Sequence, residues 1–126
     1  MRERTARLTA AALGASAVAA CTVTVPRLAA PSPATLTAVR SLAPHRCNAT
    51  TASVLDALAV RPAAVGSVYY DPRVSGGSER TFLQGYDAWV RLAGQGGDLV
   101  IRHDTACSFI GSYTTAGLRL GPGRPS

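Results

Sequence analysis

Two cysteines and two histidines are the side chains of this sequence with the clearest capacity for chemistry. His45 lies two residues before Cys47, and His103 lies four residues before Cys107. Two cysteines and two histidines can hold zinc tetrahedrally, but these halves lie much farther apart than in a zinc finger. An even pair of cysteines in an oxidising compartment favours a disulfide, which here closes a loop of about 60 residues. We predict a Cys47–Cys107 disulfide, no metal site and no cofactor.

A second group of candidate residues combines one aromatic ring with charged side chains: Trp89, Arg91, Arg102, Asp87 and Asp104. Tryptophan and arginine are enriched in binding hot spots, and a tryptophan ring stacks on sugar rings. The group therefore favours a recognition patch. Two structural alternatives remain open, namely an arginine stacked on an exposed tryptophan and a tryptophan buried between two sheets.

The carboxylates of Asp87 and Asp104 are expected to lie opposite each other on paired strands. Two close carboxylates can hydrolyse a glycoside or bind calcium. The alternative is that both are solvated at the open end of a hairpin, because like charges directly opposite are unfavourable. No Gly-x-Ser-x-Gly turn is present, so a serine nucleophile has little support.

These candidates belong to a predicted hairpin of residues 86–92 and 99–103 around the loop 94–97. Side chains alternate faces along a strand, and one register places both apolar sets on one side. In that register the apolar pairs are Leu92 with Leu99, Val90 with Ile101, and Ala88 with His103. On the reverse side the pairs are Arg91 with Val100, Trp89 with Arg102, and Asp87 with Asp104.

One short helix and several short strands complete the expected fold. Residues 51–60 suit a helix capped by Thr51, with an apolar face that includes Leu55. After Pro62, the runs at residues 65–70, 80–83, 107–115 and 118–120 have strand character. The predicted fold is mostly β, a small β-sheet or sandwich-like domain with one short N-terminal helix and one disulfide.

Residues 1–20 predict an export signal. Three arginines within residues 1–7 precede a mainly apolar run that ends at residue 20 and is too short to span a bilayer comfortably. Two processing outcomes are open. Val18-Ala19-Ala20-Cys21 resembles a bacterial lipobox, in which cleavage leaves a lipidated Cys21 as the new N-terminus. Ordinary cleavage would instead follow Ala19, or Ala34 if the signal extends to residue 34.

Three further segments are expected after the signal. Residues 21–46 predict a proline-rich linker or tether, because Pro26, Pro31, Pro33 and Pro44 interrupt regular structure. The globular domain then covers residues 47–120. Residues 121–126 are expected to form a disordered tail.

The charges argue against a nucleic-acid partner. From residue 35 onward, nine arginines face six acids and are scattered singly, whereas nucleic-acid binding needs clustered positive charge.

From the predicted signal we expect an exported bacterial domain, secreted or lipid-anchored through Cys21, with no other membrane contact. Its expected role is to bind an extracellular protein, an envelope glycan or a small ligand without catalysis.

Two other functions stay open, a small secreted hydrolase that uses the Asp pair and an inhibitor of extracellular proteases. A flat or convex patch around Trp89 favours binding. A cleft around the aspartates favours the hydrolase, and a protruding, braced loop at residues 75–78 favours the inhibitor.

Overall fold

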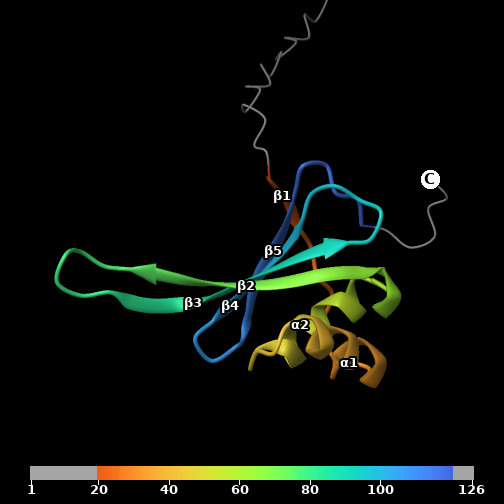
Figure 1. Ribbon diagram of the computed structural model, residues 1–126, viewed down its shortest axis with the longest axis horizontal. Coiled ribbons are helices and arrows are strands. Elements are labelled where there is room, and N and C mark those ends of the chain that lie inside the picture. The colour runs from red at the N-terminus through yellow and green to blue at the C-terminus, as the bar shows by residue number, and fades with distance from the viewer. Residues whose placement is uncertain (1–19, 121–126) are drawn as a thin grey trace, which may run out of the picture.

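The computed structural model describes residues 20–120, which form one antiparallel sheet and two α-helices (Figure 1). The elements in chain order are β1 (Ala20–Val23), α1 (Pro33–Leu42), α2 (Asn48–Ala57), the 3₁₀ turn η1 (Pro62–Ala64), β2 (Val65–Ser75), β3 (Phe82–Leu92), β4 (Leu99–Asp104) and β5 (Phe109–Thr115). The predicted signal up to residue 19 and the predicted tail at 121–126 lie outside the described residues.

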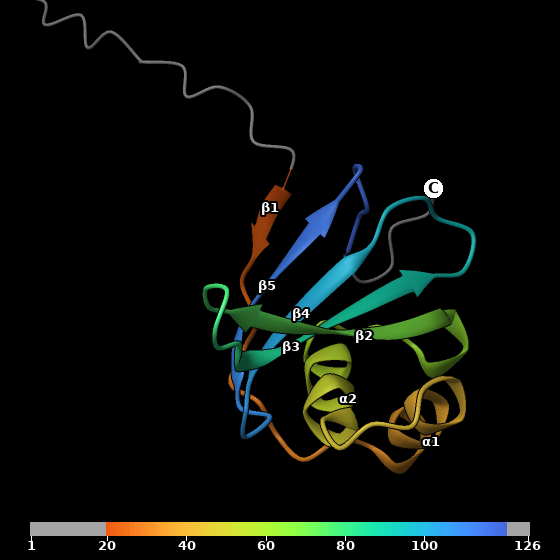
Figure 2. The same cartoon turned by 60° about the vertical axis from the view of Figure 1, so that its left-hand side comes forward.

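The five strands lie in the order β1-β5-β4-β3-β2, and each neighbouring pair is antiparallel. Figure 2 shows both helices on the same side of this sheet. The mostly β prediction is confirmed. The sandwich-like variant and the single helix are not, because one sheet with two helices makes up residues 20–120.

The core lies between the sheet and the helices. Alternate residues of β3 and β4 point toward α1 and α2, so Val90, Leu99 and Ile101 are fully buried, and Leu92 is nearly so. Val39 of α1 and Leu55 of α2 belong to the same apolar cluster. The predicted apolar face of the hairpin is therefore confirmed.

Helix α1 corrects the expectation of an irregular tether over residues 21–46. Ser32 caps this helix, since its Oγ accepts a hydrogen bond from the Thr35 N–H. Pro33 occupies the first turn, where a missing N–H costs nothing. Pro44 follows the C-cap residue Ala43. The prolines therefore bracket a helix instead of interrupting one.

Helix α2 begins three residues earlier than the sequence predicts. The expected cap, Thr51, lies inside the helix, and its backbone N–H donates to the Cys47 carbonyl. The start is set by Cys47, which is bonded to Cys107 in the turn before β5. The predicted disulfide is thus confirmed, and it ties α2 to the sheet.

The register of the β3–β4 hairpin differs from the prediction by two residues. Val90 pairs with Leu99, and Asp87 pairs with Arg102 instead of Asp104. The reason lies in the flanking strands, because Leu92 pairs with Val65 of β2 and Asp98 exchanges hydrogen bonds with Thr115. A slip of two residues leaves every side chain on its predicted face.

Strands β2 and β3 continue beyond the rest of the sheet as a two-stranded arm (Figure 1). Its outer part exposes three apolar side chains, Val74, Phe82 and Leu83. The predicted loop at residues 75–78 lies at its end, where a Cβ on Gly76 would collide with the Arg80 carbonyl. Residues 118–120, expected as a last strand, have no strand structure.

Candidate functional site

The sheet face turned away from the helices carries a row of aromatic side chains. Tyr69 of β2 pairs with Trp89 of β3, Trp89 pairs with Val100 of β4, and Val100 pairs with Tyr113 of β5. Paired residues of antiparallel strands share a face, so these four side chains form one line across the sheet. With neighbouring strands about 4.8 Å apart, the line from β2 to β5 is about 14 Å long.

Val100 shows how this row is packed. Its side chain is fully buried although it lies on the face that the helices do not cover. Trp89 and Tyr113, its neighbours on either side, are both half-buried. We infer that the two rings lean over Val100, while Tyr69 at the end of the row is 65% exposed. The row is a strip of aromatic side chains across the sheet, and Tyr69 is its most exposed ring.

Asp87 lies beside this strip and is held by two arginines. Its Oδ1 lies 2.8 Å from the Arg73 Nε and 3.3 Å from the Arg102 Nε. Another Arg73 nitrogen, Nη2, donates to the His103 carbonyl at 2.6 Å. The Arg73 Nε makes no hydrogen bond to the described residues, so its contact with Asp87 is an ion pair only.

The expected pairing of Asp87 with Asp104 is wrong. Asp104 lies opposite Gly85, and its Oδ1 accepts hydrogen bonds from the backbone N–H groups of Ala106 and Ser108. The carboxylate that lies across from Asp87 belongs to Asp71 of β2. Asp104 therefore organises the turn that carries Cys107, and it is not part of a carboxylate pair with Asp87.

The other flank of the aromatic strip carries a second ion pair. Arg91 is exposed, and its Nε lies 3.5 Å from the Asp98 Oδ1. Together the two flanks hold three arginines and three aspartates, so their formal charges cancel. The charged residues counted are Arg73, Arg91, Arg102, Asp71, Asp87 and Asp98.

A glycine leaves open space next to the strip. Gly111 of β5 pairs with Arg102, and it precedes Tyr113 by one alternation along the strand. A Cβ added at Gly111 would meet no atom within 4 Å. Glycine inside a strand often marks a place where another molecule approaches the backbone closely.

The opposite face holds a buried polar network around the disulfide. The Tyr70 hydroxyl donates to the Asn48 Oδ1 at 2.6 Å, and it lies 2.8 Å from the Thr51 Oγ1. Burial raises the pKa of Tyr70 to about 12, so the phenol stays protonated. The His103 Nε2 lies 3.1 Å from the same Thr51 oxygen.

His103 in this network is fully buried and neutral. Its Nδ1 lies 3.1 Å from the Tyr86 carbonyl, which can only accept, so the proton sits on Nδ1 and the unprotonated Nε2 faces the Thr51 hydroxyl. Burial lowers the pKa of His103, against the opposing effect of the bond to Tyr86. Because Thr51 is also fully buried, this hydroxyl–imidazole pair is closed to substrates.

His45 covers the same network from outside. Its ring stacks on Tyr70 with the centroids 3.8 Å apart, and its Nδ1 accepts the Cys47 N–H at 3.0 Å. Partial burial and the adjacent Arg46 charge lower the pKa of His45. Arg46 also donates to the Tyr86 hydroxyl.

The zinc alternative does not fit these positions. Both cysteines are consumed by the disulfide, and both histidines have other hydrogen-bond partners. Within residues 20–120, no cluster of three or more His, Cys, Asp or Glu side chains is arranged to hold a metal ion.

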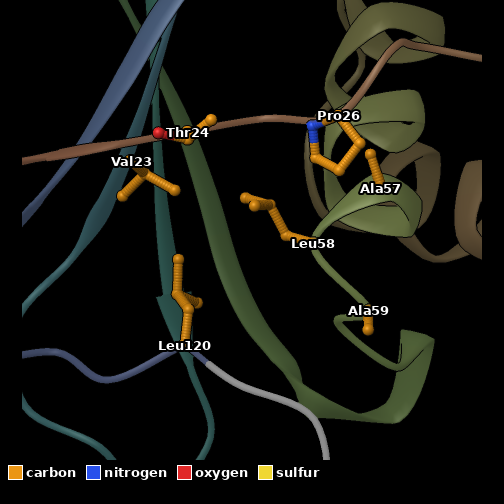
Figure 3. A pocket seen from close by; sticks show the side chains of 7 residues that line it. All are labelled: Val23, Thr24, Pro26, Ala57, Leu58, Ala59 and Leu120. Carbon is orange, nitrogen blue, oxygen red and sulfur yellow. The ribbon is translucent and has the colours of Figure 1, made fainter.

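An apolar pocket of roughly 320 Å³ lies between the end of β1 and the end of α2 (Figure 3). It is lined by Val23, Thr24, Pro26, Ala57, Leu58, Ala59 and Leu120. Its volume is at the lower end for ligand pockets, and no charged side chain lines it. It offers apolar contact but no group that could orient a ligand.

Comparisons with protein-family models, curated proteins and solved structures returned no match. In the part of the chain that the structure describes, no helix has both the length and the apolar composition needed to cross a membrane.

The structure brings together four of the five predicted site residues and adds others. Trp89, Arg91, Arg102 and Asp87 lie on the face away from the helices, and Asp104 is separated into its turn. The sequence analysis missed Tyr69, Tyr113 and Arg73. A signal was present in the alternation of residues 65–70 and 107–115, but only the strand order shows that these residues line up with Trp89.

Proposed function

We propose that this protein is an exported, non-catalytic domain that binds a neutral glycan chain along the aromatic strip of Tyr69, Trp89 and Tyr113. The observation that carries the proposal is the alignment of these three rings in one row on the sheet face that the helices leave uncovered. Aromatic rings stack against the apolar faces of sugars, and tyrosine and tryptophan dominate binding surfaces.

The flanks of the strip support a ligand that is uncharged. The three arginines there are all paired with Asp87 or Asp98, so an anion would have to break an ion pair to bind. Sugar hydroxyls both donate and accept hydrogen bonds. They can use free guanidinium N–H groups and free carboxylate oxygens without separating the charges.

The shape of the strip supports a chain instead of a single sugar. The row is about 14 Å long, and its rings lie side by side on neighbouring strands. Gly111 leaves the surface beside Tyr113 flat, because the position of a Cβ there is open space. An extended ligand can therefore cross from β2 to β5.

The decisive experiment uses Trp89, the single tryptophan of the chain. Soluble neutral hexose and N-acetylhexosamine oligosaccharides are titrated into the protein while Trp89 fluorescence is followed, with an anionic polysaccharide as comparison. We expect a saturable change with at least one neutral oligosaccharide and none with the anionic one. No response to any neutral oligosaccharide would contradict the proposal.

Calorimetry on variants then locates the site. Gly111→Val should keep the fold, since valine suits a strand and its Cβ has room. It should weaken binding at least tenfold, because the valine side chain would project from the flat surface beside Tyr113. Tyr113→Ala should do the same by removing a ring. Phe82→Ala is the matched control, because this exposed ring lies on the arm, away from the strip.

One observation favours a second candidate, the inhibitor of extracellular proteases. The loop at residues 75–78 ends the projecting arm, as expected for an inhibitory loop (Figure 1). The disulfide, however, joins α2 to the turn before β5 and does not brace this arm. An inhibition assay against secreted serine proteases tests this candidate, and Ser75→Pro should abolish any inhibition that depends on the arm.

A further inference from the structure

We infer that the chain is processed at the peptide bond between Ala19 and Ala20, so that β1 is the first element of the mature protein. The inference rests on the export that we propose above and concerns which of the possible bonds is cut. Water adds across this bond in the active site of a signal peptidase, leaving a carboxylate on Ala19 and a free amino group on Ala20.

Strand β1 is the first reason. Four consecutive residues, from Ala20 to Val23, pair with β5 from Thr115 to Ser112. The Ser112 hydroxyl also donates to the Val23 carbonyl. A cut after Ala34 would remove this strand and leave β5 as an exposed edge strand. Such an edge can pair with another chain and promote aggregation.

The segment between β1 and α1 is the second reason. Val23, Val25 and Leu28 are partly buried against the core cluster. Val23 and Pro26 also form one wall of the apolar pocket over Leu58 (Figure 3). Losing these residues would turn that wall into exposed apolar surface.

The start of α1 is the third reason. Ser32 caps the helix, and its backbone N–H donates to the Asp56 Oδ2 at 2.6 Å. The Ser32 and Thr35 hydroxyls both donate to the Asp56 Oδ1. Cleavage after Ala34 would remove the cap and two of the three donors that tie α1 to α2.

The same geometry argues against a lipid on Cys21. Cys21 pairs with Thr114 within β1, so no spacer separates this residue from the sheet. The segment that was expected to serve as a tether instead packs on the core. A diacylglycerol at this position would hold the edge of the sheet directly against the bilayer. Cleavage after Ala19, where the small residues Ala17 and Ala19 flank Val18 in an Ala-x-Ala pattern, leaves Cys21 as an exposed thiol.

The test is expression of the full chain in a bacterium that exports it, followed by intact mass and N-terminal sequencing. We expect a chain that starts at Ala20, with one alkylatable thiol and one disulfide. A start at Thr35, or a start at a lipid-modified Cys21, would overturn the inference while leaving export intact. A retained Met1 would overturn both the inference and the proposed export.

Two matched substitutions sharpen the result. Ala19→Leu places a bulky residue before the cut and should slow processing at least tenfold, so that precursor accumulates. Ala34→Leu changes an exposed residue in the first turn of α1 and should be processed like the wild type. Normal processing of Ala19→Leu combined with blocked processing of Ala34→Leu would identify the later bond and refute the inference.

Discussion

Asp87 lies directly opposite Arg102 across the β3–β4 pair, with 3.3 Å between its Oδ1 and the Arg102 Nε. Arg73 reaches the same oxygen from β2. One nearly buried carboxylate thereby joins three neighbouring strands at the edge of the aromatic strip.

Replacing Asp87 with alanine should destabilise the domain by about 2 kcal/mol, because two guanidinium groups then face each other without a counter-charge. Arg102→Ala should cost less than about 1 kcal/mol, since its side chain is 42% exposed. Urea unfolding measures both values. Asp71→Asn is the control, and it should be neutral or slightly stabilising because it relieves a like-charge pair. Equal losses for Asp87→Ala and Asp71→Asn would contradict this account.

Two adjacent residues of β3 should respond in opposite ways to substitution. Val90 is fully buried, so Val90→Asp places an unpaired charge in the core and should unfold the domain. Arg91 is exposed on the other face, and Arg91→Ala should change the stability by less than about 1 kcal/mol. Circular dichroism and thermal unfolding distinguish the two results. A folded Val90→Asp protein would show that the described core is wrong.

The disulfide should contribute a large part of the stability of a domain this small. Its partners are 60 residues apart, and the chain-entropy model gives about 4 kcal/mol for such a loop. We expect a Cys47→Ser, Cys107→Ser double variant to lose about 2–5 kcal/mol in denaturant unfolding. Cys21→Ser should have no effect, because this cysteine is exposed and free.

Stability should fall as the pH is lowered below 6.5. The pKa of His103 in the folded chain is lowered by burial, and that of His45 is lowered by burial and the Arg46 charge. The unfolded chain therefore binds protons first, which favours unfolding between pH 6.5 and the lowered folded values. Well above pH 6.5, both histidines are neutral in the folded and in the unfolded chain, so the full stability is present.

Urea midpoints at pH 8, 7, 6 and 5 test this prediction. His103→Gln should flatten the profile more than His45→Gln, since His103 is fully buried and His45 is only partly so. Asp56 does not interfere in this range. Burial alone would raise the pKa of Asp56, but the hydrogen bonds from Ser32 and Thr35 lower it below its usual value. The contribution of Asp56 to stability is therefore lost only as the pH falls below 3.8. A midpoint that rises toward pH 5 would contradict the prediction.

The faces of the central strands could be predicted from the sequence, but their exact partners could not. Alternation assigned Val90 and Ile101 to one side and Trp89 to the other, because the period of a strand is two residues. The register was two residues off because Leu92 and Asp98, which close the hairpin, are held by β2 and β5. Local patterns carry no information about such third strands.

Helix α1 and the aromatic strip escaped prediction for related reasons. Pro33 and Pro44 suggested irregular structure, although proline is compatible with the first helical turn and with the residues after the last. Tyr69 and Tyr113 are 44 positions apart in the chain, by subtraction of their numbers, and they meet Trp89 only through the strand order. The strand order brings the three rings together, so the sequence pattern of each strand by itself could identify only Trp89.

The pairing of β1 with β5 has a consequence for how the chain reaches this structure. Cys21 and Thr114 are partners, and they are 93 positions apart by subtraction of their numbers. Contacts at such separation are formed slowly, since a long loop must be closed before they contribute. Within residues 20–120, β1 lies at the edge of the sheet and pairs with β5 alone, so it can pair only after β5 has been synthesised. The sheet therefore cannot be completed until the chain has been synthesised as far as residue 115.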